Sequence, residues 1–296
     1  MKKTVFEGAA TAIVTPMRAD GSIDFESFGR LIEWQIAEGI DAIVAAGTTG
    51  EGSTLSDEEH KSVVEFAVKT AAKRVPVIAG TGSNDIAYAK ELTKFSCDIG
   101  ADAMLVVTPY YNKATQNGLI RSFTEVADIS TKPVILYNVP SRTGCNIQPK
   151  TCAILAEHPN IAAIKEASGN ISQIAEIAAL TQGKLDIYSG NDDQIVPVMS
   201  LGGKGVISVL SNILPKETSQ ICKSYLSGDV KTSLFLQLKY LDLINALFAE
   251  VNPIPIKAAT AKMGYGENAL RLPLTQIEDA HADTLFTLMR AAGIEI

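Results

Sequence analysis

The strongest constraint on the fold is an alternation of short apolar runs with segments of helical periodicity, repeated over about the first 225 residues. Each run ends in Gly, Pro, Ser or Thr, and the runs are continuously apolar, which is typical of parallel strands covered on both faces. The runs are TAIVTP (11–16), DAIVAAG (41–47), VPVIAGTG (75–82), ADAMLVVTP (101–109), PVILYNVP (133–140), IAAIKEAS (161–168), LDIYSG (185–190) and GKGVIS (203–208). Helical patterns between them include 56–73, 84–98, 115–130 and 170–181.

The number of apolar runs matches the eight strands of a (β/α)8 TIM barrel, which is an α/β fold. We therefore predict a barrel over residues 1–225, which is the candidate catalytic unit. From about Leu226 the strand pattern stops, and Leu and Phe at helical spacing predict a C-terminal helical extension over 226–296. No linker or low-complexity tract separates the two parts, so we expect one compact unit.

Charge and composition narrow the classes of partner. The formal net charge of −7 argues against nucleic acid, because neutralising phosphates requires clustered Lys and Arg. No run approaches the roughly 18 apolar residues of a membrane span, and Glu7 and Gly8 interrupt the stretch in which a signal peptide would develop. The four cysteines include no CxxC pair and there are three histidines, which predicts reduced thiols and no metal site. We expect a cytoplasmic protein that acts on small molecules.

Polar residues gather where the predicted strands end, and active sites of TIM barrels lie at the C-terminal ends of the strands. The segments after these ends are GTTGEG (47–52), GTGSN (80–84), TPYYN (108–112), YNVPSRTG (137–144), KEASGN (165–170) and SGNDD (189–193). GTTGEG lacks the Lys of a phosphate-binding P-loop, and GTGSND has Asp85 where a dinucleotide fingerprint needs its third Gly. We therefore expect no nucleotide cofactor.

Lys165 ends an apolar run and has two interpretations. Its stem packs on the sheet while its ammonium reaches water, or it is a buried Schiff-base nucleophile. An ordinary lysine is almost wholly protonated at pH 7, and burial in apolar surroundings favours the uncharged form that attacks carbonyls.

Two interpretations also exist for Tyr137, for Arg142 and for the Asp192–Asp193 pair. Tyr137 ends the preceding strand as a core aromatic or as a proton shuttle beside Lys165. Arg142 is a solvated side chain or a clamp for a carboxylate. For Asp192 and Asp193 we favour helix N-capping over metal binding, because no histidine is near them in the sequence.

The motifs GTTGE, TPYYN, YNVPSRTG and IKEASGN, in this order, resemble those of the dihydrodipicolinate synthase family of pyruvate-dependent Schiff-base aldolases, and the resemblance extends to VNPIPIKAA at 251–259. It implies condensation of pyruvate with L-aspartate 4-semialdehyde to 4-hydroxy-tetrahydrodipicolinate, a lyase reaction of lysine and diaminopimelate biosynthesis, without a cofactor. The protonated imine on the lysine is itself the electron sink.

The resemblance also implies the residue roles. Lys165 would form the imine with pyruvate, and Tyr137, Thr48 and Tyr111 would relay protons, with Tyr111 reaching in from a neighbouring subunit. The residues implied to bind substrate are Thr49, Gly190 and the carbonyl of Ile207 for pyruvate, and Arg142 for the carboxylate of aspartate semialdehyde. A homotetramer built from two dimers follows from the same resemblance.

Rival functions remain within the superfamily and outside it. An N-acetylneuraminate lyase or keto-deoxy-sugar acid aldolase shares the barrel, the lysine and the tyrosine, but Arg142 and the Thr48–Thr49 pair favour the synthase. A non-catalytic barrel that only binds a small acid would lack the lysine or some of the residues that relay protons. In this chain Lys165, Tyr137, Thr48 and Tyr111 are all present.

Feedback inhibition by lysine occurs in many members of the family. At the matching positions this chain keeps His60, Asn84 and Tyr110, but it departs elsewhere. The departures are Gly52 in place of Ser, Asp57 in place of His and Tyr88 in place of Glu. Loss of the acidic partner for the ligand's ammonium predicts weak or absent inhibition.

Overall fold

Eight parallel strands close into a barrel in the computed structural model, which describes residues 2–296. Each strand pairs with the next along the chain and the eighth pairs with the first, so the sheet has no free edge. The strands are β1 (Gly8–Ala12), β2 (Ala42–Ala45), β3 (Val77–Gly80), β4 (Ala103–Val107), β5 (Val134–Asn138), β6 (Ile161–Glu166), β7 (Asp186–Ser189) and β8 (Gly205–Ser208). The predicted TIM barrel is confirmed.

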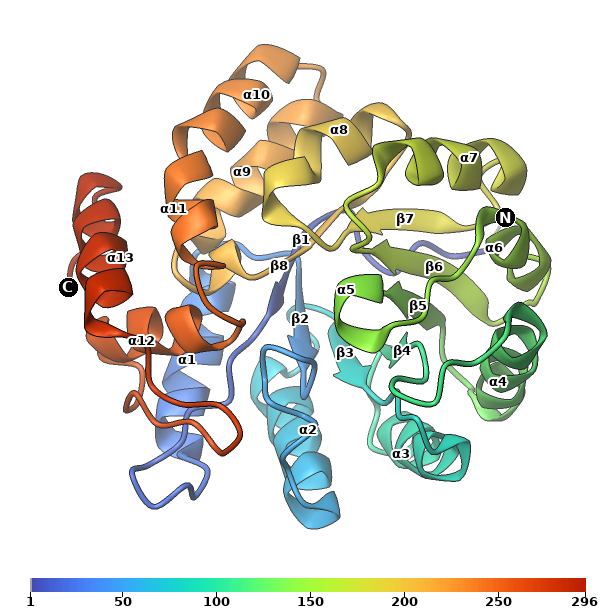
Figure 1. The fold of residues 1–296 in the computed structure, drawn as a ribbon, viewed down its shortest axis with the longest axis horizontal. Coiled ribbons are helices and arrows are strands. Elements are labelled where there is room, and N and C mark those ends of the chain that lie inside the picture. The colour runs from blue at the N-terminus through green and yellow to red at the C-terminus, as the bar shows by residue number, and fades with distance from the viewer. Residues whose placement is uncertain (1) are drawn as a thin grey trace.

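Helices surround the strands (Figure 1). They are α1 (Phe25–Ala37), α2 (Asp57–Ala71), α3 (Ile86–Asp98), α4 (Gln116–Ile129), α5 (Pro140–Thr143), α6 (Pro149–Leu155), α7 (Ile171–Thr181), α8 (Ile195–Ser200) and α9 (Pro215–Leu226), with 3-10 turns η1 (Asp192–Gln194) and η2 (Leu210–Asn212). The four predicted helical segments correspond to α2, α3, α4 and α7. The start of α2 is set by a capping box, in which Ser56 and Glu59 each accept a hydrogen bond from the other's backbone N–H.

The prediction for the first strand is wrong by three residues, because β1 begins at Gly8 rather than at Thr11. Its sequence GAATA is small and weakly strand-like. After it, Ile13 N still donates a hydrogen bond to Val44 O of β2 at 3.1 Å, and the chain leaves the barrel at Val14. Val14 is buried, but its N–H donates to the Asn212 side chain instead of to a strand. Hydrophobicity reports burial there rather than strand pairing.

Two apolar layers build the protein, and they differ in side-chain size. Between the sheet and the helices lie large side chains such as Phe28, Leu31 and Phe123. The barrel interior is instead rich in alanines, namely Ala10, Ala12, Ala42, Ala103, Ala163 and Ala167. Because alanines fill less space than the branched residues usual in barrel interiors, the interior has room for polar side chains at its C-terminal end.

Four helices follow the barrel: α10 (Val230–Lys239), α11 (Leu241–Ala246), α12 (Ile254–Lys262) and α13 (Asp279–Ala291). In Figure 1, α12 and α13 lie together at the left edge, and α10 lies beside α9 at the top. The boundary at 225/226 stays a prediction. Within residues 2–296, no helix combines the length and apolarity needed to span a bilayer.

Candidate active site

Lys165 and Tyr137 lie side by side in the barrel interior. They are directly opposite each other in the β5–β6 pairing, and Lys165 Nζ lies 4.4 Å from the centroid of the Tyr137 ring. Both are buried, with 5% and 6% of their surface exposed. Because Ala163 and Ala167 belong to the interior cluster and side chains alternate along a strand, Lys165 also points inward. Of the two interpretations, the structure supports the buried amine.

The end of β6 is held by the residue after the lysine. Glu166 is buried on the opposite face of the strand, and its carboxylate accepts hydrogen bonds from Ser168 N (2.7 Å), Asn138 Nδ2 (3.0 Å) and Gln173 Nε2 (3.2 Å). These donors come from the loop after β6, from β5 and from α7. The network therefore fixes the two strand ends that carry Tyr137 and Lys165.

The GTTGEG loop follows β2 in a conformation that is unusual for side-chain-bearing residues. Ala46 and Glu51, which flank the two threonines, have φ of 53° and 56°, in the left-handed region that favours glycine. Thr48 is half-buried, whereas Thr49 is buried and its hydroxyl accepts a hydrogen bond from Asn252 Nδ2 at 3.0 Å. The two threonines thus occupy fixed positions at the C-terminal end of the barrel.

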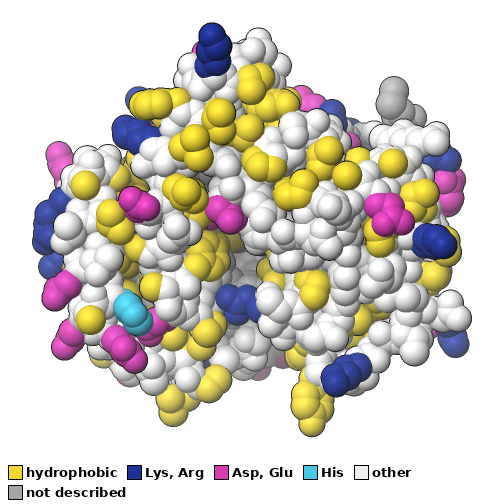
Figure 2. Space-filling model, turned by 45° about the horizontal axis from the view of Figure 1, so that its top comes forward, with side chains coloured by type: hydrophobic (Ala, Val, Ile, Leu, Met, Phe, Trp, Pro, Cys, Tyr) yellow, Lys and Arg dark blue, Asp and Glu magenta, His cyan; other side chains and the backbone are white. Residues whose placement is uncertain are grey.

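A cavity of about 330 Å³ opens beside these groups. Thr48, Tyr137 and Arg142 contribute to its wall, together with His60 and Tyr110. Figure 2 shows a hollow in the middle of one face of the molecule, with a basic side chain inside it. A cavity of this size that combines apolar walls, hydroxyls and a guanidinium suits a small carboxylic acid.

Arg142 lies at the mouth of the cavity on the short helix α5 and is exposed. Its Nη2 donates a hydrogen bond to the backbone oxygen of Asn252 at 2.9 Å. That contact uses one of the five donors of the guanidinium. The remaining N–H groups provide the bidentate pattern that a carboxylate accepts.

Gly190 directly follows β7, and Ile207 lies in β8. A Cβ on residue 190 would lie 2.6 Å from the Cβ of Ala167 and 3.1 Å from Glu166 O, so only glycine fits beside the end of β6. Ile207 is in β8, and its side chain belongs to the same interior cluster as Tyr137. Gly190 therefore lies against the end of the strand that carries Lys165, and Ile207 packs in the barrel interior with Tyr137.

Tyr111 points away from the site of its own chain. Among the other predicted site residues, Thr48, Tyr137 and Arg142 line the cavity, whereas Lys165, Thr49, Gly190 and Ile207 are not part of its wall. Its side chain is 89% exposed, its φ is 74°, and its N–H points to Thr143 O at 3.4 Å. The neighbouring Tyr110 lines the cavity instead. An aromatic ring held in a strained, exposed conformation is a candidate contact for a second molecule.

The capping prediction for the Asp192–Asp193 pair needs correction in its detail. Asp192 does not cap its own turn but accepts hydrogen bonds from Val209 N (3.0 Å) and Leu210 N (2.9 Å) at the start of η2. Burial raises the pKa of its carboxyl group. Within residues 2–296 no cluster of three His, Cys, Asp or Glu side chains is arranged around a metal site, and all four cysteines are buried free thiols.

Four of the six positions matched to lysine binding line the cavity, namely Gly52, His60, Tyr88 and Tyr110, whereas Asp57 and Asn84 do not. Burial lowers the pKa of His60, whose Nε2 is 2.7 Å from Gly80 O. Asp57 forms an ion pair with Lys61 at 2.7 Å, and that hydrogen bond is the main reason why its pKa is lowered. The carboxylate of Asp57 therefore already has a cationic partner within the chain.

Two residues at the site, Asn252 and Lys257, were missed by sequence reasoning. Asn252 contacts both Thr49 and Arg142, and Lys257 forms a buried ion pair with Glu51. The available signal was the segment VNPIPIKAA, in which a lysine stands inside an apolar run just as Lys165 does.

Comparison with known proteins matches nearly the whole chain to one family. The model of the dihydrodipicolinate synthetase family matches residues 5–292. A 4-hydroxy-tetrahydrodipicolinate synthase of Lachnoclostridium phytofermentans is 57% identical over 98% of this chain and 99% of its own length. The dihydrodipicolinate synthase of Acinetobacter baumannii, solved with pyruvate, superposes with a TM-score of 0.96 at 45% identity, covering 99% of this chain and 100% of its own. The Cyanidioschyzon merolae enzyme with lysine bound gives a TM-score of 0.96 at 39% identity, with the same coverage of both chains.

Proposed function

Because the chain belongs to the dihydrodipicolinate synthetase family, we propose that it is a lyase that condenses pyruvate with L-aspartate 4-semialdehyde to 4-hydroxy-tetrahydrodipicolinate. The observation that carries this proposal is the inward-pointing amine of Lys165, which is buried beside the Tyr137 ring. A buried lysine amine next to a tyrosine hydroxyl is the arrangement that imine formation with a keto acid requires.

The chemistry proceeds through a covalent imine. The Lys165 amine attacks the keto carbon of pyruvate, and the keto oxygen leaves as water. The iminium nitrogen then accepts the electron pair of a methyl C–H bond as the proton departs, which gives an enamine. The enamine carbon attacks the aldehyde carbon, whose oxygen takes a proton. Finally the substrate's own amine attacks the iminium carbon and releases Lys165, closing the ring.

Each proton transfer in this sequence needs a hydroxyl close to the reacting atoms. Tyr137 is in contact with Lys165, and Thr48 lines the same cavity. We assign them to a relay that is completed by Tyr111 of a neighbouring subunit. A relay of neutral hydroxyls moves protons without placing a net charge in the apolar barrel.

We divide substrate binding between the strand ends next to Lys165 and the cavity that Arg142 lines. Thr49, Gly190 and the carbonyl of Ile207 hold pyruvate next to Lys165. Arg142 binds the carboxylate of the semialdehyde at the mouth, where its free N–H groups lie. The buried position of Thr49 and the exposed position of Arg142 fit this order, because the pyruvate imine must form before the second substrate binds.

We also propose a homotetramer made of two dimers. The exposed ring of Tyr111 supports one contact, since no cavity of its own chain receives it. A second contact is supported by apolar side chains on one side of α10, namely Val230, Leu234, Phe235 and Leu238, which are 43–64% exposed. Sedimentation at assay concentrations tests this, and a fully active monomer would contradict it.

The test of function has two parts. Borohydride added with pyruvate should raise the mass of the protein by one reduced pyruvyl adduct, located on Lys165 by peptide mapping. Coupled assays then compare aspartate semialdehyde with sialic acid and keto-deoxygluconate. An unmodified protein would leave only a binding role, and faster turnover of a sugar acid would place the chain among the sugar-acid lyases.

A further inference from the structure

A buried ion pair ties the C-terminal extension to the GTTGEG loop. Lys257 Nζ on α12 lies 2.5 Å from Glu51 Oε1, and the two side chains are 2% and 1% exposed. Among the ion pairs within residues 2–296, no other has both side chains as deeply buried as these two. Burial lowers the pKa of Lys257, and Glu51 opposes that effect. Two charges removed from water in this way are retained only where each satisfies the other.

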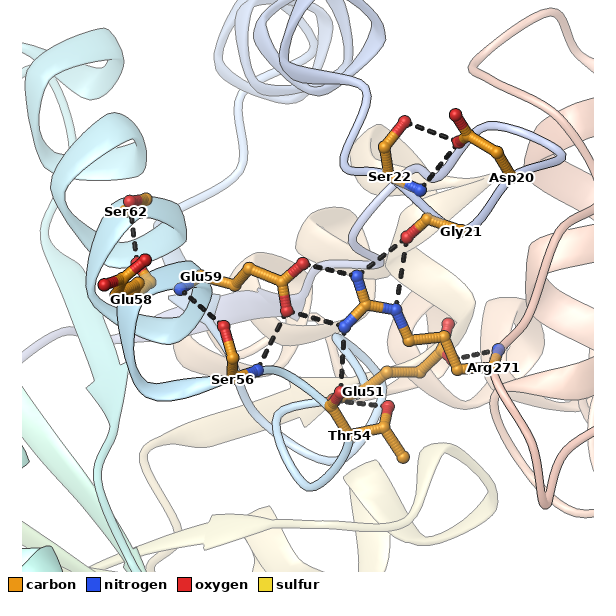
Figure 3. A network of polar contacts seen from close by, with 10 residues as sticks. All are labelled: Asp20, Gly21, Ser22, Glu51, Thr54, Ser56, Glu58, Glu59, Ser62 and Arg271. Carbon is orange, nitrogen blue, oxygen red and sulfur yellow. Dashed lines mark hydrogen bonds and ion pairs between the residues drawn. The ribbon is translucent and has the colours of Figure 1, made fainter.

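The second carboxylate oxygen of Glu51 also contacts the C-terminal extension. Its Oε2 accepts a hydrogen bond from the backbone N–H of Arg271 at 3.2 Å. Figure 3 shows the Arg271 guanidinium reaching from there to Glu59 on α2, with two contacts of 2.6 Å, and to Thr54 O. Both ends of the segment that follows the two threonines are therefore held by residues more than 200 positions later in the chain.

The loop requires such external contacts because its own backbone is strained. Ala46 and Glu51 are in the left-handed region, and each non-glycine residue there carries a free-energy cost that surrounding contacts must offset. The turn itself contributes few hydrogen bonds, among them Glu51 N to Thr48 O and Gly52 N to Gly47 O, each at 3.1 Å. The side chain of Glu51 is the point at which the extension acts on the turn that presents Thr48 and Thr49.

We propose that Glu51 and Lys257 are positioning residues that hold Thr48 and Thr49 in their reactive geometry. The inference rests on the proposed function, in which these threonines serve the proton relay and pyruvate binding. The extension is then part of the catalytic framework, and it acts through the loop rather than by touching substrate.

The decisive variant is Glu51→Gln combined with Lys257→Met. The double variant removes both charges, so neither charged group is left buried without its partner. Replacing a buried ion pair in this way is often neutral for stability. We expect its thermal midpoint to stay near that of the wild type, and the single Lys257→Met variant to unfold at a lower temperature because it leaves a buried carboxylate alone. Ile221→Val, which trims a buried side chain of α9 far from the loop in sequence, is the control for a small stability loss.

Three measurements on the full-length double variant test the proposal. We expect a kcat at least tenfold lower, a several-fold higher KM for pyruvate with the KM for aspartate semialdehyde within twofold, and faster hydrogen exchange in peptides covering 46–55 only. Ile221→Val should change none of these. A folded double variant with wild-type kcat, pyruvate KM and loop exchange would overturn the inference. Failure of the wild type to trap pyruvate would instead overturn the proposed function, while loop exchange would still decide the positioning role.

Discussion

Replacing Lys165 by methionine should abolish turnover and at the same time stabilise the protein. Methionine keeps nearly the length and volume of the lysine stem and cannot form an imine. The lysine amine is buried in an alanine-lined interior, and Tyr137 faces it at 4.4 Å. The chain therefore retains a desolvated polar group at the position that chemistry requires, where an apolar side chain would pack better.

The magnitude follows from two opposing contributions. A buried polar group without a full set of partners costs about 1–3 kcal/mol, and a charged one costs more. The contact with the Tyr137 ring offsets about 0.5–2 kcal/mol of this. Both contributions disappear in Lys165→Met, so the middle of these ranges predicts a gain of about 1 kcal/mol in the free energy of unfolding. For a chain of this size that corresponds to a rise in the thermal midpoint of roughly 1–2 °C.

Differential scanning calorimetry of the ligand-free proteins measures the shift. Lys69→Met is the control for the methionine itself, because Lys69 is 71% exposed on α2, where substitutions usually change stability by no more than about 0.5 kcal/mol. The mass after borohydride and pyruvate should be unchanged in Lys165→Met. A lower midpoint than the wild type would refute the reasoning, since it would show that the amine has stabilising partners in the folded protein.

Three further outcomes are expected. Arg142→Ala should leave borohydride trapping of pyruvate intact but lower kcat/KM for aspartate semialdehyde about tenfold to a hundredfold, because a charge-assisted hydrogen bond is worth about 1.5–3 kcal/mol; greater harm to pyruvate would place Arg142 at the other substrate. The hydrogen bond from Arg271 lowers the pKa of Glu59 to about 2, so its contribution is present above the ordinary carboxyl pKa of 4.5 and is lost as pH falls toward 2; urea unfolding between these values should show a steeper loss for the wild type than for Glu59→Gln, and equal slopes would contradict it. Initial rates across a lysine titration should show weak or no inhibition, because Asp57 is already paired and Tyr88 carries no charge; strong inhibition below about millimolar lysine would count against this.

Much of the fold and of the catalytic core is encoded locally in the sequence. Strand and helix periodicity repeats over segments of 4 to 15 residues, and backbone geometry converts it directly into a parallel barrel. Strand ends of a parallel barrel share one edge, so Lys165 and Tyr137 could be placed together from their positions alone. The family resemblance is confirmed by the comparisons, although it is the resemblance, and not periodicity, that suggests roles for Thr49, Gly190 and Ile207.

Tertiary structure alone decided how the far end of the chain meets the site. Glu51 and Lys257 are 206 positions apart and Thr49 and Asn252 are 203 apart, and no local pattern relates side chains at such separations. The bounds of β1 were likewise decided by backbone pairing, because Gly8 pairs with Gly205 of β8, while the N–H of Val14 beyond the strand donates to the Asn212 side chain. Periodicity reports which face of an element is buried, whereas the identity of the partner across the core depends on the packing of the whole chain, which placed a buried cation from α12 against the loop that follows β2.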